Sequence, residues 1–401
     1  MTRRVSASLF ALVLLAASLA ALPQAGQPSA QKHFPAKGEW ARRDAAALGL
    51  DKAKLDEAIA FAVENQNQRT KDLAADILAT FRREAPYNNL IGPTQERTGS
   101  NGVIIRGGYV AASWGDTGRA DMTFSVTKSF LSTTVGVLYD RGLIKDLNAR
   151  VATAMPPGVD LFESEHNATI TWDHLLRQTS DWSGTLWDKP DWADRPEGPT
   201  MEEAKNRKMS DPGTRYKYND VRVNVLALAA LHVAKEPLPQ ILKTAIMDPI
   251  GASDSWRWEG YNNSWVTING QKMQSMTGGG HWGGGMFINA WDMARFGYLF
   301  LNNGKWGDRQ LISEKWIGMA RTPGAVNPTY GFMNWFLNVP TRRSNGTEAR
   351  GIAAAPPSVV TFRGNGENII YIDRENDLVV VIRWATSSNG FFQRVLAAKI
   401  N

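Results

Sequence analysis

The chain has 401 residues and no cysteine, which excludes disulfides, thiolate zinc sites and cysteine nucleophiles. Its formal charge is +6, but the basic residues are scattered among acidic ones and form no basic tract. Nucleic acid is therefore not an expected partner. The length allows a full hydrophobic core and two domains.

The N-terminus has the pattern of an export signal. Two arginines at positions 3 and 4 precede an apolar stretch, Leu9 to Leu22, which is too short to span a bilayer but suits a signal peptide. Small residues allow cleavage near Ala20 or Ala30, and the arginine pair also suggests twin-arginine export, although the rest of that signal matches poorly. We expect residues 1–30 to be signal peptide and linker, with export to the periplasm or the extracellular space and no membrane span afterwards.

The next elements lead to a candidate nucleophile. After a linker over 31–50 and a helix over 51–65, residues 103–114 read as two strands joined by a Gly-Gly turn. Ser125-Val126-Thr127-Lys128 follows, at the start of an apolar helix that ends at Arg141-Gly142. Residues three apart share a helix face, so Lys128 can lie beside the Ser125 hydroxyl. The S-x-x-K pattern alone is weak, because Ser29 to Lys32 carries it too.

The remainder of the chain separates into helical and strand-forming parts. Short helical pieces between Pro and Gly fill 145–275, whereas strands are expected at 368–373 and 378–384 and a closing helix at 391–400. The predicted fold class is α/β (α+β): an antiparallel sheet flanked by helices, with an inserted all-helical domain. The expected domains are 31–144 plus 276–401, an α/β sandwich, and 145–275, the helical insertion.

A serine nucleophile needs a base, and its acyl intermediate needs a proton path and an oxyanion site. Tyr218 follows a Pro-Gly turn ahead of a helix and can reach a cleft, where a nearby ammonium would favour proton relay; packing under the helical part is the alternative. Gly364, entering the late hairpin, would let a substrate approach backbone N–H groups. Two decoys are Lys243-Thr244, in a helical stretch, and His281-Trp282-Gly283, which precedes a segment that reads as loop and helix rather than strand.

In this order, Ser125/Lys128, Tyr218 and the Gly364 segment resemble the serine β-lactamase and penicillin-binding-protein-like superfamily. The pattern is most similar to class C β-lactamase-related hydrolases, which include family VIII esterases and 6-aminohexanoate-dimer hydrolases. The resemblance covers about residues 40 to 400 and implies a β-lactamase-like fold. Further matching motifs are Asp121 to Phe124, His174 to Ser180, Gly283 to Met286, Asp292 to Phe296 and Tyr330 to Met333.

The resemblance implies roles for particular residues. Ser125 would be acylated, Lys128 and Tyr218 would share proton transfer, and the backbone N–H groups of Ser125 and Asn365 would form the oxyanion hole. Two departures favour an ester, an amide or a peptide over a β-lactam. Asp220 stands where an amide usually contacts the substrate, and Phe362-Arg363-Gly364 stands where the family has K-T-G.

Other residues complete the expected site. Asp220, Arg363, Gly364, Trp187 and His281 are candidate substrate-binding residues. Tryptophans in the insertion either roof a pocket for an apolar or sugar-like substrate or pack the helical part; they are Trp172, Trp182, Trp187 and Trp192. The five histidines show no H-E-x-x-H pairing or carboxylate cluster, so we expect no metal and no cofactor.

The sequence therefore predicts an exported serine hydrolase acting on a small-molecule or peptide-like substrate. One alternative is a D-alanyl-D-alanine carboxypeptidase or weak β-lactamase, for which cell-wall fragments would be partners. An alternative of another class is a non-catalytic protein that binds peptidoglycan or peptides. No G-x-S-x-G motif occurs, which argues against an α/β-hydrolase triad.

Overall fold

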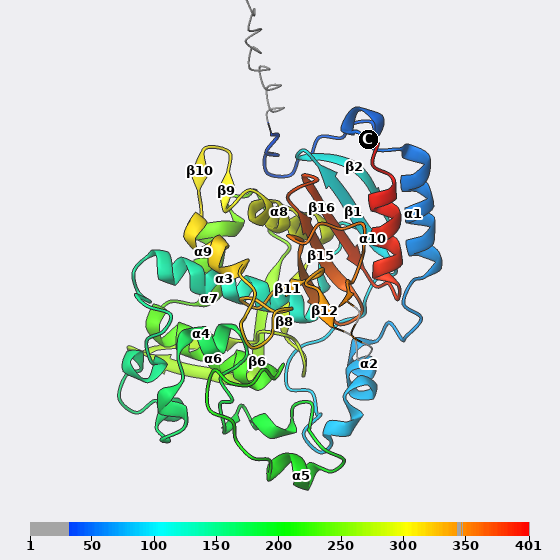
Figure 1. Cartoon of the computed structure of the whole chain (residues 1–401). Coiled ribbons are helices and arrows are strands. Elements are labelled where there is room, and N and C mark those ends of the chain that lie inside the picture. The colour runs from blue at the N-terminus through cyan, green and yellow to red at the C-terminus, as the bar shows by residue number, and fades with distance from the viewer. Residues whose placement is uncertain (1–31, 343–345, 347, 401) are drawn as a thin grey trace, which may run out of the picture. The chain divides into compact units, whose positions relative to one another are not determined.

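A computed structural model describes residues 32–342, 346 and 348–400. The expected signal peptide therefore lies outside the described residues. From His33 onward the chain forms one compact unit, which contains two antiparallel sheets and the helices around them (Figure 1).

The larger sheet has six strands in the order β11-β14-β15-β16-β1-β2. Their bounds are β1 Asn101–Arg106, β2 Tyr109–Trp114, β11 Trp335–Phe336, β14 Val360–Gly364, β15 Asn368–Asp373 and β16 Leu378–Arg383. The predicted hairpins at 103–114 and 368–384 are both confirmed, and β16 joins them by pairing with β1, with Val381 opposite Val103. Gly107 and Gly108 have positive φ angles of 60° and 81°, as the first hairpin turn requires.

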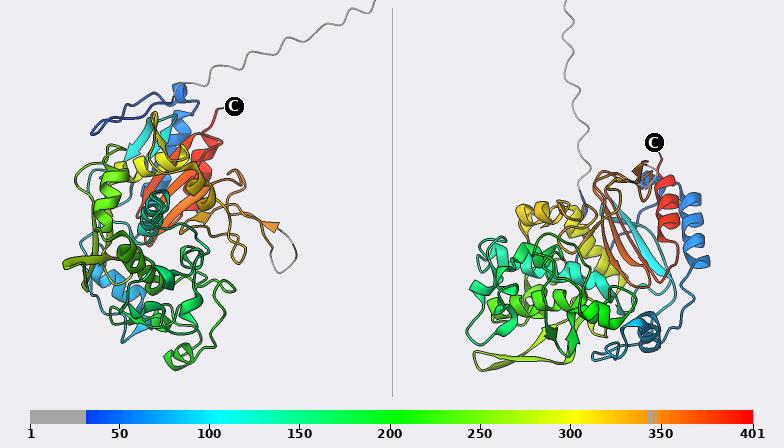
Figure 2. Two further views of the ribbon diagram at one scale, coloured as in Figure 1. Left: turned by 90° about the vertical axis from the view of Figure 1, so that its left-hand side faces the viewer. Right: turned by 60° about the horizontal axis from the view of Figure 1, so that its bottom comes forward.

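Helices cover both faces of this sheet, because its central strands are buried on both sides. Helices α1 (Lys52–Glu64) and α10 (Ser388–Ala397) cover one face, where they pack with Ile104, Val380 and Ile382. Helices α3 (Thr127–Asp140) and α8 (Ala290–Leu301) lie in the core of the other face with Val103, Val379 and Val381. Figures 1 and 2 show the sheet between α1 and α10 on one side and α8 on the other.

The smaller sheet has the order β3-β8-β6-β7, with β3 Asp121–Met122, β6 Arg257–Ile268, β7 Gln271–Met276 and β8 Gly285–Ile288. The segment 145–275 therefore contains long strands as well as helices. The segment after His281-Trp282-Gly283 was also predicted wrongly in part, since the strand β8 precedes α8. Sequence periodicity missed β8 because it has only four residues, all of them buried.

Shorter elements fill the rest of the described chain. The helices are α2 Leu73–Thr80, α4 Trp172–Leu176, α5 Met201–Lys205, α6 Asp220–Ala234, α7 Leu238–Leu242 and α9 Glu314–Ala320. The strand pairs are β4 Thr185–Leu186 with β5 Lys189–Pro190, β9 Lys305–Trp306 with β10 Arg309–Gln310, and β12 Thr341–Arg342 with β13 Glu348–Ala349. Single 3₁₀ turns occur at Ala46–Leu48, Arg82–Glu84, Phe124–Val126, Val151–Ala154, Asp160–Phe162, Asn167–Thr169 and Asp191–Ala193, and a π-helical turn at Lys243–Met247.

Helix α6 is the central helix of the 145–275 segment. The Asn219 side chain caps it by accepting a hydrogen bond from the Arg222 N–H at 3.0 Å, and every residue from Asp220 to His232 is buried. No single described helix is long and apolar enough to cross a membrane. The pair Asp220–Ala234 and Leu238–Met247 meets the length and composition together but is bent by 78°.

A buried arginine connects the two sheets. Arg383, at the end of β16, donates hydrogen bonds to the Met122 and Ile288 carbonyls of the smaller sheet, at 3.0 and 2.6 Å. Its Nε donates to the Asn368 side chain of β15 at 2.7 Å. Burial alone would raise the pKa of Asp121, but Arg383 and hydrogen bonds from Thr98 lower it below its usual range. The charge of Arg383 therefore helps to hold β3 against the larger sheet.

Candidate active site

Ser125 lies in the 3₁₀ turn Phe124–Val126, directly before α3. Phe124 has a φ angle of 50°, which is unusual for a residue with a side chain. Neighbouring bonds fix this turn: the Thr127 hydroxyl donates to the Phe124 carbonyl at 2.6 Å and accepts from the Met286 N–H at 2.9 Å. The turn presents the half-buried Ser125 at the N-terminus of α3, where the helix dipole favours a developing anion.

Lys128 lies one turn further along α3. Its Nζ is 3.0 Å from the Ser125 Oγ and donates to the Asp220 Oδ1 at 2.5 Å. The side chains of Lys128 and Asp220 are each only 1% exposed. The expected Ser–Lys contact is thus present, and the structure adds a carboxylate on the far side of the ammonium.

Tyr218 comes from the loop that leads into α6. Its ring stacks on Trp335 of β11, with centroids 5.6 Å apart, and the Lys128 Nζ lies 4.8 Å from the ring centroid. The Arg195 guanidinium lies 5.0 Å from the same centroid. Two cations therefore adjoin the tyrosine ring, and one of them is the Lys128 ammonium that contacts Ser125.

The end of β14 closes the site opposite Ser125. A Cβ on Gly364 would lie 3.1 Å from the Ser125 N and would overlap the Thr123 carbonyl oxygen, so only glycine allows this approach. The next residue, Asn365, accepts hydrogen bonds on its Oδ1 from Arg69 at 3.0 Å and from the Gly366 N–H at 2.9 Å. An oxyanion hole formed by the Ser125 and Asn365 N–H groups remains a prediction.

A cavity of about 380 Å³ opens over Ser125. It is lined by Thr80, Phe81, Ser125, Arg195, Tyr218, Trp335, Arg363, Gly364 and Asn365. Alternation along β14 places Phe362 in the core, against Phe300, and Arg363 on the cavity. Burial lowers the pKa of Arg363. Arg363 thus faces the site, an orientation that strand alternation alone left open.

Asp220 is buried beneath the cavity and surrounded by cations. Its Oδ2 accepts a hydrogen bond from the Arg195 Nη1 at 2.7 Å and lies 3.5 Å from the His281 Nδ1. Burial opposes ionisation of Asp220, but the charges of Lys128, Arg195 and His281 hold its pKa well below the usual range. The carboxylate at this position is therefore charged and cannot reach a substrate in the cavity.

His281 is also buried, at 1% side-chain exposure, behind Phe81. Its Nε2 lies 2.7 Å from the Glu84 Oε2 and 3.9 Å from the Asp194 Oδ1. Asp194 in turn pairs with Arg195 at 2.6 Å and accepts from the Asp220 N–H. Ligand-type atoms of Glu84, Asp194 and His281 lie within 4.8 Å of one another, close enough to share a metal ion. They are already paired with each other and with Arg195, whose charge disfavours a divalent cation there.

The structure does not bring every candidate to the Ser125 cavity. Trp187 lines a different cavity, of about 580 Å³, beside Leu186 and Val266. Trp172 and Trp182 are buried in the core, which fits the packing alternative. Asp220 and His281 lie behind the cavity wall rather than on it.

Sequence reasoning missed Glu84, Asp194 and Arg195. They belong to no motif, and Glu84 lies 197 positions from His281 in the chain. One signal was present: a buried carboxylate at position 220 needs hydrogen-bond donors for its second oxygen besides the one lysine.

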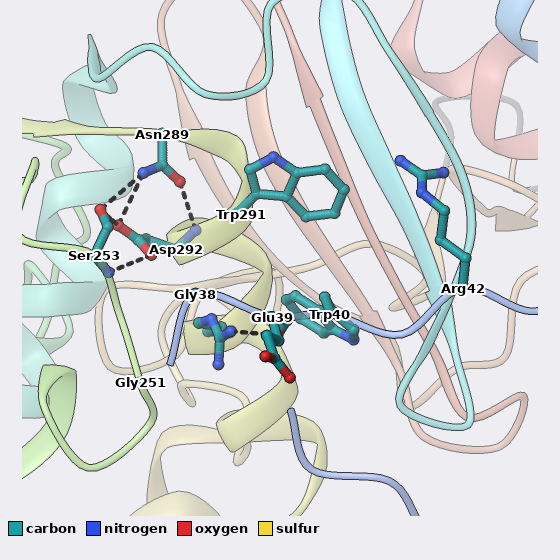
Figure 3. A pocket seen from close by; sticks show the side chains of 10 residues that line it. Gly38, Glu39, Trp40, Arg42, Gly251, Ser253, Asn289, Trp291 and Asp292 are labelled. Carbon is teal, nitrogen blue, oxygen red and sulfur yellow. Dashed lines mark hydrogen bonds between the residues drawn. The ribbon is translucent and has the colours of Figure 1, made fainter. Parts of the chain in front are cut away.

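A third cavity, of about 320 Å³, lies between the start of α8 and the segment around Trp40 (Figure 3). Asn289, Ser253 and Asp292 bond to one another there, at 2.6 to 3.0 Å. Arg295 donates to the carbonyls of Pro35, Ala36, Glu39 and Ile250. The first group thus joins the loop at Ser253 to the start of α8, and Arg295 attaches the N-terminal segment to the same helix.

Comparisons with known proteins identify the fold and the family. No curated protein sequence matches the chain. Among solved structures, a beta-lactamase-like protein from Bacteroides dorei DSM 17855 superposes with a TM-score of 0.54 at 13% identity, covering 80% of this chain and 98% of its own. A Bacillus anthracis protein assigned as a 6-aminohexanoate-dimer hydrolase has a TM-score of 0.52 at 16% identity, covering 92% and 88%.

A third solved structure is EstCE1, a hydrolase with promiscuous acyltransferase activity, which has a TM-score of 0.51 at 14% identity and covers 87% of this chain and 99% of its own. At these identities the three structures show the fold. The Beta-lactamase family, in contrast, matches the sequence itself over residues 93–400. Since that match covers more than half of the chain and includes Ser125, Lys128 and Tyr218, the protein belongs to the Beta-lactamase family and is a serine hydrolase.

Proposed function

We propose that this hydrolase cleaves an ester or amide bond through an acyl-enzyme on Ser125. The observation that carries the proposal is the 3.0 Å contact between the Lys128 Nζ and the Ser125 Oγ, beside a cavity of about 380 Å³. In the first step the Ser125 Oγ attacks the carbonyl carbon and its proton passes to the Lys128–Tyr218 pair. The same proton then reaches the leaving group, and water releases the acyl group by the reverse path.

The lining of the cavity supports a substrate other than a β-lactam. Arg363 and Gly364 are the proposed substrate contacts, since both line the cavity. The Arg363 Nε donates a hydrogen bond to the Thr361 hydroxyl at 2.9 Å, which holds the planar guanidinium group in place. A lysine of the K-T-G type is replaced by Phe362, which is fully buried. Asp220 and His281 act from behind the wall, and Trp187 is not part of the proposed site.

Export of the mature enzyme is the second part of the proposal. It rests on the signal-like sequence before residue 31, and it would place the enzyme in the periplasm or outside the cell, where peptide-like cell-wall fragments occur.

Covalent labelling tests the proposed chemistry. Purified protein is incubated with a fluorophosphonate and, separately, with a fluorescent penicillin; Ser125→Ala is the test variant. Ser132→Ala, with a buried serine two turns further along α3, is the matched control. We expect phosphonate labelling of wild type and Ser132→Ala and none of Ser125→Ala.

The two probes also separate the alternatives. Phosphonate labelling without penicillin labelling supports the esterase or amidase. Labelling of Ser125 by both probes would favour a carboxypeptidase or weak β-lactamase. No Ser125-dependent labelling by either probe would contradict the acyl-enzyme and favour a non-catalytic binding protein.

A further inference from the structure

The faces of the His281 ring are covered by aromatic side chains. Phe81 lies with its ring centroid 3.7 Å from that of His281, and Trp282 lies at 4.3 Å with its plane tilted by 64°. The side chain is 1% exposed. The ring edge, which carries the two nitrogens, is therefore the part of His281 that makes polar contacts.

Both nitrogens face carboxylate oxygens. Nε2 lies 2.7 Å from the Glu84 Oε2, and Nδ1 lies 3.5 Å from the Asp220 Oδ2. An ionised carboxylate only accepts hydrogen bonds, whereas neutral imidazole carries a single N–H. A neutral ring would therefore direct a lone pair at one of two buried anions. Only the imidazolium presents an N–H to both.

The charges around His281 also favour its imidazolium form. Three buried carboxylates surround the ring edge: Glu84 from the Arg82–Glu84 turn, Asp194 from the loop after Asp191–Ala193, and Asp220 from the start of α6. Arg195 and Lys128 supply two positive charges in direct contact with them. Lys189 also lies nearby, but we leave it out of the charge count because its ammonium donates hydrogen bonds to the backbone carbonyls of Tyr87 and Asn89. A proton on His281 supplies the third positive charge and makes the cluster neutral.

The titration of His281 follows from these contacts. Burial alone would lower its pKa, and Arg195 acts in the same direction, but the carboxylates of Asp194, Asp220 and Glu84 raise it above the ordinary value of 6.5. The neighbours thus favour the charged ring.

This cluster is connected directly to the reaction centre. The Asp220 Oδ2 faces Arg195 and His281, while its Oδ1 holds the Lys128 ammonium next to Ser125. We propose that His281 is a positioning residue which, as a doubly protonated imidazolium, fixes Asp220 and through it Lys128, so that turnover at Ser125 requires the proton on His281. The inference rests on the proposed function, because it concerns the same nucleophile.

Nitrogen NMR of protein labelled with ¹⁵N-histidine tests the protonation state directly. At pH 6.5, the ordinary pKa of histidine, we expect an imidazolium signal, with both ring nitrogens protonated, that is absent from His281→Gln. His174 and His232 are buried, and burial lowers their pKa values, so they should be neutral at this pH. A neutral His281 ring from pH 6 to 9 would overturn the inference.

The second measurement is the pH dependence of kcat/KM on p-nitrophenyl butyrate. For the wild type we expect a fall of about tenfold per pH unit above the pH at which the NMR signal of His281 titrates. His281→Gln should have lower kcat/KM without that alkaline limb, since glutamine has no proton to lose. His232→Gln, also at a buried histidine but beside the Trp187 cavity, should keep the wild-type profile.

A double-variant comparison supplies a further check. Because His281 acts through Asp220, adding His281→Gln to Asp220→Asn should lower kcat/KM no further than Asp220→Asn alone. An alkaline limb that persists unchanged in His281→Gln would refute the positioning role. Loss of Ser125 labelling in the wild type would instead refute the proposed function, while the NMR signal would still report the protonation of His281.

Discussion

The carboxylate of Asp220 changes the electrostatics beneath Ser125. An amide at this position would be neutral, whereas the carboxylate holds Lys128 at 2.5 Å and Arg195 at 2.7 Å. Desolvating these charges is unfavourable, and only the close pairing offsets it. The Lys128 ammonium is therefore fixed by a partner on the side away from the substrate, next to the Tyr218 ring.

Asp220→Asn should destabilise the protein in a way that depends on pH. Removing one partner from a buried pair costs about 3–5 kcal/mol, because the remaining charges stay buried. Since the pKa of Asp220 is lower in the folded protein, its contribution is complete above the unfolded value of about 4 and is lost as pH falls through the folded value. Urea unfolding at pH 7 and at pH 3 measures this difference, which should shrink at pH 3.

Asp254→Asn is the control for this experiment. Asp254 forms an exposed pair with Lys37, and its loss should leave the urea midpoint nearly unchanged. Equal effects of the two substitutions at pH 7 would contradict the account of Asp220.

At the scale of elements, the loop between β7 and β8 packs against the ion pair that joins α3 to α6. A Cβ on Gly279 in this loop would overlap the Asp220 Oδ1. It would also lie 2.4 Å from the Lys128 Nζ, which is closer than real Cβ atoms approach a neighbour. The loop thus crosses directly over the ion pair that joins the two helices, and its glycine content is a requirement of packing. Glycine-rich loops also bind phosphate, but packing accounts for the glycine at position 279 without a phosphate ligand.

Gly279→Ala should therefore separate Lys128 from Asp220. We expect phosphonate labelling of Ser125 to slow by at least about tenfold, because Lys128 would no longer be held in place beside the Ser125 hydroxyl. Gly318→Ala in α9, where a Cβ would meet no atom within 4 Å, should label at the wild-type rate. Labelling rates measured on the two variants under the same conditions decide the matter; equal rates would show that the loop tolerates the methyl group.

Element by element, local patterns predicted what local interactions determine. The two hairpins, α1, α3 and the closing helix were expected from periodicity and turn residues. Helix α10 spans Ser388–Ala397 and so begins and ends three residues earlier than the predicted 391–400. Ser125 with Lys128 was found because their contact lies within one helix turn. The charge cluster was not found, because Glu84, Arg195 and His281 are brought together only by tertiary packing. Contacts between residues far apart in the sequence leave no local sequence pattern.

At the scale of the whole molecule, Arg383 joins the two sheets through buried hydrogen bonds. Arg383→Met would remove the charge that most lowers the pKa of Asp121 and would take a hydrogen-bond donor from each of two carbonyls. We expect the free energy of unfolding to fall by about 3–5 kcal/mol. Urea unfolding followed by tryptophan fluorescence checks this. The exposed Arg309 of β10 provides the control, Arg309→Met, which should unfold like the wild type; a similar midpoint for Arg383→Met would contradict the role of Arg383.

Burial of the ion pairs beneath Ser125 has a consequence for the response of the enzyme to salt. Dissolved ions screen charges that water reaches, such as Lys37 and Asp254, over about 10 Å at 0.1 M. They do not enter the space between Lys128 and Asp220, where both side chains are 1% exposed. Ionic strength would therefore alter the surface field of this basic protein and leave the field at its nucleophile almost constant.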